Sequence, residues 1–290
     1  MIIESINWYP GHMKKTRELI RDHLKAVDCV IEVIDARIPL SSRNPIVDEL
    51  IGGRPRVVLL NKADLAEEKT TVEWAEHLTT AGTIAWPVNS LSGQGLSLLP
   101  AQLQKLQKTD QLKKPDFRPL RLMIAGVPNV GKSSLINRLT GRKATQTGDR
   151  PGVTKGKQWL TLANGMKLLD TPGILWPKFE DPRTGLNLAL CGSIKDEILD
   201  PAEMGLALLR ALAPRYGDLL IERYKLDELP EDALEAMELI ARKRGFLLSG
   251  GRIDYERTGR TLLDEFRAGQ IGRISLERPD DEATEPAGAE

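Results

Sequence analysis

The sequence predicts an α/β domain over residues 1–176, a small all-α domain over residues 177–276 and an acidic, disordered tail over residues 277–290. The first prediction follows from short, β-branched apolar segments that alternate with helical patterns, as in sheets of buried parallel strands. The second follows from the region after about Trp176, where helical stretches dominate. We therefore expect a sheet covered by helices on both faces, followed by a helical appendage.

The expected elements of the first domain follow one another with polar turns between them. The segments predicted as strands are short and mostly apolar, whereas those predicted as helices carry an apolar stripe on one face. We expect strands at residues 29–34, 56–60, 84–88, 120–125, 158–162 and 166–169. We expect helices at residues 14–25, 67–78, 96–112 and 133–139.

The second domain is expected to contain helices only, at residues 186–199, 202–212, 219–224, 232–244 and 261–267. In the segment 232–244, apolar residues recur on one face and basic residues crowd the end. Two basic clusters stand out, Lys14, Lys15, Arg17 and Arg21 in the first domain and Arg242, Lys243 and Arg244 in the second. Each cluster could contact RNA or form an ordinary solvated helix face.

The composition is that of a soluble globular protein, with 41% hydrophobic and 28% charged residues. The sequence has no apolar run near the roughly 18 residues that a membrane span needs, and its N-terminus lacks the layout of a signal peptide. Cys29 and Cys191 are far apart among apolar neighbours, which favours buried thiols over a disulfide or a metal site. We therefore expect a cytoplasmic protein without a membrane partner.

The formal net charge is zero, but the charge is unevenly distributed. Residues 277–290 hold six acidic residues and Arg278 and have no large apolar residue, so they are expected to be disordered. Residues 1–276 then carry a net charge of +5. This mildly basic body permits an RNA partner without demonstrating one.

Residues Gly126–Ser133 fit the pattern G-x-x-x-x-G-K-[ST], which predicts a loop that holds nucleotide phosphates. The glycines let backbone N–H groups face phosphate oxygens, and the helix that follows adds its dipole. Lys132 is expected to reach the β- and γ-phosphates, and the Ser133 hydroxyl to bind Mg²⁺. The other loop residues expected at the nucleotide are Asn129, Val130, Gly131 and Ser134. The alternative is a glycine-rich turn of an unrelated α/β protein.

A second motif, Asn61-Lys62-Ala63-Asp64, fits the guanine-reading pattern N-K-x-D and follows a predicted strand. The Asp64 carboxylate can accept hydrogen bonds from N1 and N2 of guanine, whereas adenine lacks this pair of donors. Asn61 is expected to bridge toward the phosphate loop, and Lys62 to lie along the base plane. A polar turn without a ligand is the alternative.

The two motifs occur in a rotated order. The N-K-x-D element precedes the phosphate loop, whereas it follows that loop in the ordinary Ras-like order. Asn89 and Ser90 end the next predicted strand, where a backbone N–H would face guanine O6. Together these features predict a P-loop, Ras-like GTPase domain with circularly permuted motif order, which binds GTP and GDP.

Two further segments are expected to sense the γ-phosphate. Asp170-Thr171-Pro172-Gly173 fits D-x-x-G at the end of a predicted strand. Asp170 would hold Mg²⁺ through water, and the Gly173 N–H would contact the γ-phosphate. Thr154 is the candidate switch threonine, which closes on Mg²⁺ only when GTP is bound. An ordinary loop threonine is the alternative.

These motifs, together with Trp8–Met13, Asp35–Arg37 and Pro151–Thr154, resemble those of the RbgA/YlqF family of circularly permuted GTPases. The resemblance covers about residues 5–276, including Leu188–Leu190 and Ile194–Glu197. It implies GTP hydrolysis coupled to maturation of the large ribosomal subunit, with a precursor of that subunit as partner and with the C-terminal domain, residues 177–276, in contact with ribosomal RNA. No DNA partner is expected. It also implies stimulation by K⁺, associated with Asn129.

The residue after the D-x-x-G motif is Ile174, where Ras-type enzymes have a glutamine that orients the attacking water. Intrinsic hydrolysis is therefore expected to be slow. One hypothesis gives this role to His12, and local packing or an RNA contact is its alternative. A second hypothesis places K⁺ at Asn129, for which plain capping of the loop is the alternative.

The leading functional interpretation is a GTP-driven assembly factor that acts on a ribosomal particle. One alternative is a regulatory GTPase that acts on a protein or a tRNA-modification partner. Another is a nucleotide-dependent RNA-binding module whose hydrolysis is incidental. An ATP-using kinase is a more distant alternative.

Overall fold

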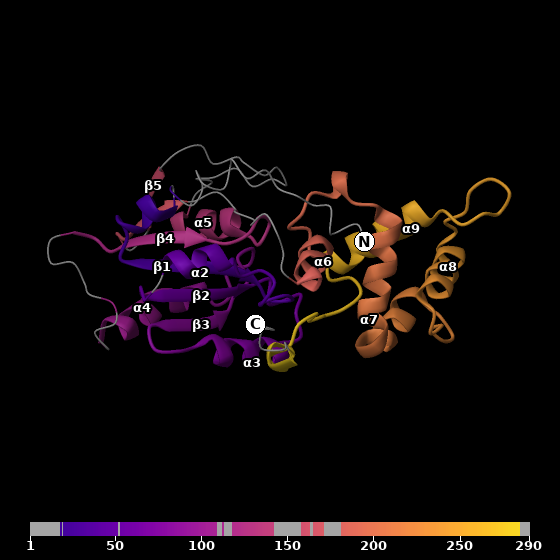
Figure 1. Ribbon diagram of the computed structural model, residues 1–290, viewed down its shortest axis with the longest axis horizontal. Coiled ribbons are helices and arrows are strands. Elements are labelled where there is room, and N and C mark those ends of the chain that lie inside the picture. The colour runs from indigo at the N-terminus through magenta and orange to yellow at the C-terminus, as the bar shows by residue number, and fades with distance from the viewer. Residues whose placement is uncertain are drawn as a thin grey trace, which may run out of the picture.

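The computed structural model describes residues 18, 20–51, 53–108, 112, 118–141, 158–162, 165–170 and 181–284. A β-sheet with its own helices lies beside a group of helices, α6 to α9, and α6 is the member of that group nearest the sheet (Figure 1). This is the α/β fold with a helical appendage that the sequence predicts. The expected boundary near residue 176 lies outside the described residues.

Among the described residues, six strands form one sheet in the order β3-β2-β1-β4-β6-β5. They span Cys29–Asp35 (β1), Arg56–Asn61 (β2), Thr83–Pro87 (β3), Arg121–Ala125 (β4), Gln158–Thr161 (β5) and Lys167–Asp170 (β6). Neighbouring strands are parallel except β5 and β6, which form the expected antiparallel pair. Every residue of β1 and β2 is buried, because both faces of the sheet are covered.

The alternation of side chains along β1 divides the core of the sheet into two layers. Ile31 and Val33 belong to the cluster that contains the apolar face of α4 (Leu99–Lys108) and α5 (Lys132–Thr140). Val30 and Ile34 belong to clusters with α2 (Pro45–Ile51) and α3 (Glu68–Leu78). Residues 18 and 20–24 are also helical, within the helix expected at 14–25.

The helical part consists of α6 (Pro182–Leu190), α7 (Pro201–Tyr224), α8 (Ala233–Arg244) and α9 (Tyr255–Arg267). An aspartate caps the N-terminus of each helix by accepting a hydrogen bond from a backbone N–H of the first turn. Gly205 of α7 and Gly259 of α9 allow these two helices to pack closely, because a Cβ at either position would collide with the backbone of the other helix.

Several helix boundaries differ from those expected. The helix expected at 186–199 ends at Leu190, because the chain reverses at Gly192 (φ 76°), and only a 3-10 turn, η3 (Asp196–Ile198), follows. The two helices expected at 202–212 and 219–224 form the single helix α7, with a kink at Tyr216 shortly after Pro214. The helix expected at 96–112 is a 3-10 turn, η2 (Leu96–Leu98), followed by α4. Helix α2 was not expected, and α9 begins earlier than expected.

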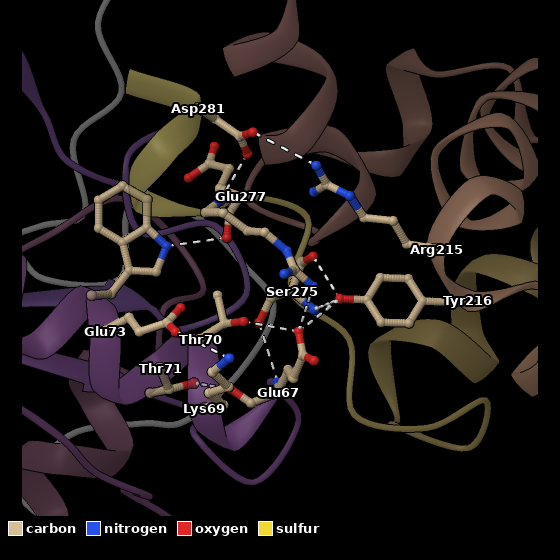
Figure 2. Close-up of polar contacts among 12 residues, drawn as sticks. Glu67, Lys69, Thr70, Thr71, Glu73, Arg215, Tyr216, Ser275, Glu277 and Asp281 are labelled. Atoms are coloured by element: carbon tan, nitrogen blue, oxygen red, sulfur yellow. Dashed lines mark hydrogen bonds and ion pairs between the residues drawn. The ribbon is translucent and has the colours of Figure 1, made fainter. Parts of the chain in front are cut away.

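The segment 274–281, the C-terminal strap, returns from the helical part to the sheet part. Figure 2 shows Ser275 of the strap between Tyr216 of α7 and Glu67 before α3. The Tyr216 hydroxyl donates to the Ser275 carbonyl (3.0 Å) and accepts from its N–H (3.1 Å). The Glu67 N–H donates to the Ser275 hydroxyl (3.2 Å). The strap therefore connects the two parts directly.

The first part of the expected disordered tail, up to residue 284, is an ordered continuation of this strap. The Glu277 carboxylate is 6% exposed and accepts hydrogen bonds from Leu40 N, Ser41 N and Asn187 Nδ2. A 3-10 turn, η4 (Pro279–Thr284), follows, and residues 285–290 lie outside the described residues. Composition alone predicts disorder here, because it cannot distinguish a solvated carboxylate from a buried one that accepts hydrogen bonds from several N–H groups.

Both cysteines are buried and unpaired, as expected. Burial raises the pKa of each thiol to about 12, so neither ionises near neutral pH. Within the described part of the chain, no helix has the length and apolar character needed to cross a membrane.

We predict that Glu277→Ala lowers the free energy of unfolding by about 2–4 kcal/mol, because it leaves the buried or partly buried donors of Leu40, Ser41 and Asn187 without an acceptor. Urea unfolding measures this difference. Asp280→Ala is the matched control, since Asp280 is an exposed acid of the same strap, and it should change stability by less than about 0.5 kcal/mol. Equal effects of the two substitutions would contradict an ordered strap.

Candidate nucleotide-binding site

The carboxyl ends of three adjacent parallel strands converge on one site. Asp35 ends β1 and Asn61 ends β2, and the two residues are register partners. Strand β4 pairs with β1 on its other side and leads into the loop that begins at Gly126. In open α/β sheets, ligands bind at the carboxyl ends of the strands. The topology therefore brings both predicted nucleotide motifs to the same edge despite their rotated order.

The phosphate loop curls around the Lys132 side chain. The Lys132 ammonium donates hydrogen bonds to the carbonyls of Gly126 (3.0 Å) and Val127 (2.7 Å) and is buried in the loop. Gly131 has a φ of 99°, and a Cβ there would collide with the side-chain nitrogen of Asn61. Glycine is thus required where the two motifs touch. Ser133 and Ser134 lie in the first turn of α5, directly after the loop.

Asn61 joins three loops. Its Nδ2 donates a hydrogen bond to the Val130 carbonyl of the phosphate loop (2.6 Å), and its Oδ1 accepts one from the Ser90 N–H (2.8 Å). Asn61 is 2% exposed, so both bonds are shielded from water. Its amide therefore fixes the N-K-x-D segment against the phosphate loop and against the loop that follows β3.

Lys62 is held by a buried ion pair. Its backbone is in the left-handed region (φ 59°), and its Nζ lies 2.9 Å from Oδ2 of Asp35. The Arg37 guanidinium donates two further hydrogen bonds to the Asp35 carboxylate, at 2.9 and 2.8 Å. Burial alone would raise the pKa of Asp35, but Arg37 and Lys62 hold that pKa well below its usual range.

The remaining residues expected at the base lie around this core. Asp64 is exposed, and its carboxylate has no hydrogen-bond or ion-pair partner among the described residues. The Asn89 side chain accepts hydrogen bonds from the N–H groups of Leu91 (2.8 Å) and Ser92 (3.0 Å), so it shapes its own loop. The Ser90 hydroxyl is buried without a partner in the described part of the chain.

Several predicted site residues belong to segments beyond the described part of the chain. Residues 1–17, 142–157 and 171–180 lie outside the described residues, and with them His12, Thr154, Gly173 and Ile174. Asp170 ends β6, which is parallel to β4, so the backbone brings this position to the same edge of the sheet. The described residues contain no group of three potential metal-binding side chains.

The roles of Asp35 and Arg37 are not predicted from the sequence, where these residues appear only among the motifs of the family resemblance. Their signal was available, since Asp35 ends an apolar strand next to the one that ends in Asn61. Arg37 is 1% exposed, and its guanidinium lies 5.1 Å from the ring centre of Phe266 in α9. A buried arginine that contacts a residue distant in the sequence could not be anticipated from local pattern.

The fold and this site define a P-loop GTPase with permuted motif order. The family model described as 50S ribosome-binding GTPase matches residues 121–211. "Ribosome biogenesis GTPase A" of Bacillus cereus is 46% identical over 280 residues, which are 95% of each chain. The GDP-bound structure of TM YlqF is 33% identical, with a TM-score of 0.65, and the match covers 91% of this chain and 100% of that one. The structure of GNP-bound YlqF from T. maritima has the same identity and TM-score and covers 92% and 99% of the two chains.

The chain belongs to the ribosome biogenesis GTPase A (RbgA/YlqF) family. The matches extend over the sheet part and the helical part alike. The predicted fold class and family resemblance are thereby confirmed.

We predict that Asp35→Asn destabilises the protein at neutral pH by about 3–5 kcal/mol, because it leaves Arg37 and Lys62 without their buried counter-charge. The folded pKa of Asp35 lies below its unfolded value of about 3.9. The contribution of the pair is therefore complete above about pH 4 and is lost as the pH falls further.

Urea unfolding at several pH values tests this prediction. The difference in free energy of unfolding between wild type and Asp35→Asn should be constant from pH 7 to about pH 5 and should shrink below about pH 4. A difference that does not change with pH would show that the substitution acts through packing alone.

Proposed function

We propose that this protein binds and hydrolyses GTP as an assembly factor for the large ribosomal subunit, and that the ribosomal particle stimulates its hydrolysis. The observation that carries the proposal is the likeness to proteins named ribosome biogenesis GTPase A over 95% of the chain, and it is supported by the two hydrogen bonds through which Asn61 joins the N-K-x-D segment to the phosphate loop and to Ser90. We also propose ribosomal RNA of a subunit precursor as the direct partner and the cytoplasm as the location.

At the nucleotide, Asp64 would accept hydrogen bonds from guanine, and Lys62, which is aimed by Asp35, would lie along the base. Lys132 would neutralise the β- and γ-phosphates, with backbone N–H groups from Val130 to Ser134 around them. The curled loop already directs the Lys132 ammonium inward, which supports these roles. In this proposal Asp64 and Lys62 recognise the base, and Lys132 binds the phosphates.

Mg²⁺ fits the residues present. Ser133 begins a helix directly after the phosphate loop, and a hydroxyl there is a hard oxygen ligand of the kind that Mg²⁺ accepts. Asp170, at the end of β6, and Thr154 would complete the set together with the nucleotide. Bound Mg²⁺ would neutralise the charge that develops on the phosphate oxygens. The N–H of Gly173 would report the presence of the γ-phosphate.

Hydrolysis needs a group that orients water, because Ile174 cannot do so. We propose His12 for this role and K⁺ at Asn129 for additional positive charge. The backbone of Asn129 is left-handed (φ 59°), and its side-chain Nδ2 donates to the Gly192 carbonyl (2.8 Å), so its Oδ1 would be the atom that binds K⁺. These two assignments are independent of each other.

The basic residues at the end of α8 have unequal roles. Arg244 forms an ion pair with Glu265 (2.7 Å) and stacks over Tyr224, so it stabilises the helical part. Arg242 and Lys243 are exposed. Arg242 pairs with Glu238 one turn earlier (2.9 Å), and Lys243 lies 3.9 Å from the fully exposed Asp227. Such pairs are weak in water, so Arg242 and Lys243 are the residues of this cluster that we propose to contact RNA.

We predict that purified large ribosomal subunits raise GTP turnover at least about tenfold, because the chain lacks its own water-orienting glutamine. Turnover is measured with and without particles, in KCl and in NaCl, for wild type and His12→Ala. His12→Ala should abolish the stimulated rate, and NaCl should lower it. Excess ATP should not compete.

Each of these three comparisons can contradict one part of the proposal. If particles leave turnover unchanged, the partner is instead a protein or a tRNA-modification enzyme. If His12→Ala keeps the stimulated rate, another group orients the water. Equal rates in the two salts would remove K⁺ from the mechanism.

A further inference from the structure

A cavity of about 680 Å³ lies between the nucleotide motifs and the helical part. Lys62 and Asn129 line it on one side, and the turn Cys191–Glu197 lines it on the other. This volume is within the range of ligand pockets of roughly 300–1,000 Å³. Since Lys62 belongs to the base-reading motif and Asn129 to the phosphate loop, the space beside both would adjoin the ribose and the α-phosphate of a bound nucleotide.

The turn after α6 is anchored at this cavity by hydrogen bonds from two sides. The Arg267 guanidinium of α9 donates to the carbonyls of Ala189 and Leu190 (both 2.8 Å) and pairs with Asp196 (2.8 Å). The Asn129 side chain donates to the Gly192 carbonyl (2.8 Å). The turn is therefore fixed to α9 at one end and to the phosphate loop at the other.

Lys195 is the cation of this turn that remains available. Its side chain is exposed, lines the cavity and has no hydrogen-bond or ion-pair partner among the described residues. Lys62 and Arg267 are instead engaged in ion pairs, Lys62 with Asp35 and Arg267 with Asp196.

Three acidic residues line the cavity as well. Asp196, Glu197 and Asp264 also line an adjoining cavity of about 270 Å³, whereas Lys62, Asn129 and Lys195 do not. Lys195 therefore shares with Lys62 and Asn129 the part of the larger cavity that does not adjoin the smaller one.

We propose that the turn Cys191–Glu197 of the helical part is a second wall of the nucleotide pocket, and that Lys195 donates to the ribose hydroxyls or the α-phosphate of the bound guanine nucleotide. This inference rests on the proposed GTP binding. GTP and GDP share the ribose and the α-phosphate, so Lys195 strengthens the binding of both and does not discriminate between them. Binding of either nucleotide also orders the junction between the two parts of the protein.

The test measures the Kd of fluorescent GDP and of a non-hydrolysable GTP analogue for the full chain. Lys195→Ala should raise both Kd values by about three- to tenfold, and Lys195→Arg should restore them, as expected for one partly exposed charge-assisted contact. Arg210→Ala is the matched control, because it removes the same charge from an exposed position of α7 away from the cavity. It should leave both Kd values unchanged.

A second readout does not depend on a substitution. Amide hydrogen exchange across residues 191–197 should slow when GDP is added to the wild-type protein. Unchanged Kd values for Lys195→Ala together with unchanged exchange would overturn the inference, while wild-type binding still supports the GTP site. Absence of nucleotide binding by the wild type would instead overturn the proposed function itself.

Discussion

The structure depends on the side-chain amide of Asn61. Its donor reaches the Val130 carbonyl and its acceptor receives the Ser90 N–H, so one buried residue unites three loops that are separated in the sequence. The requirement for glycine at position 131 follows, because a larger residue would displace Asn61. A permuted motif order is compatible with an intact site, because parallel strands bring their carboxyl ends to one edge of the sheet in whatever order they occur along the chain.

The ion pair of Asp35 and Arg37, next to Asn61 in the sheet, connects the site to the helical part. Asp35 orients Lys62, and Arg37 lies over Phe266 of α9 and accepts the Leu276 N–H of the strap at its carbonyl (2.8 Å). The helical part is thus packed against the base-reading loop rather than attached by a linker alone. A movement at the nucleotide could therefore be passed to α9 and the strap through these contacts.

Much of the fold was predictable because its signals are local. The strands are apolar, β-branched and end in motif residues, and the bridging role expected of Asn61 agrees with the geometry at Val130. The parts that local pattern missed depend on contacts between distant segments. Glu277 is buried by donors from Leu40 and Asn187, and the turn after α6 is held by Arg267. Taken alone, residues 277–290 have the composition of a disordered acidic tail, and residues 186–199 have the pattern of a helix.

The central claim is that Asp64 and Lys132 serve one guanine nucleotide, and exchange of the base tests it most directly. In Asp64→Asn the carboxylate becomes an amide, which can donate to the O2 of xanthine but cannot accept from both N1 and N2 of guanine. The Kd for GTP should rise and the Kd for XTP should fall, each by at least about tenfold, and Lys132→Ala should weaken the binding of either nucleotide to the variant. If Asp64→Asn keeps its preference for GTP over XTP, the two motifs do not form one site.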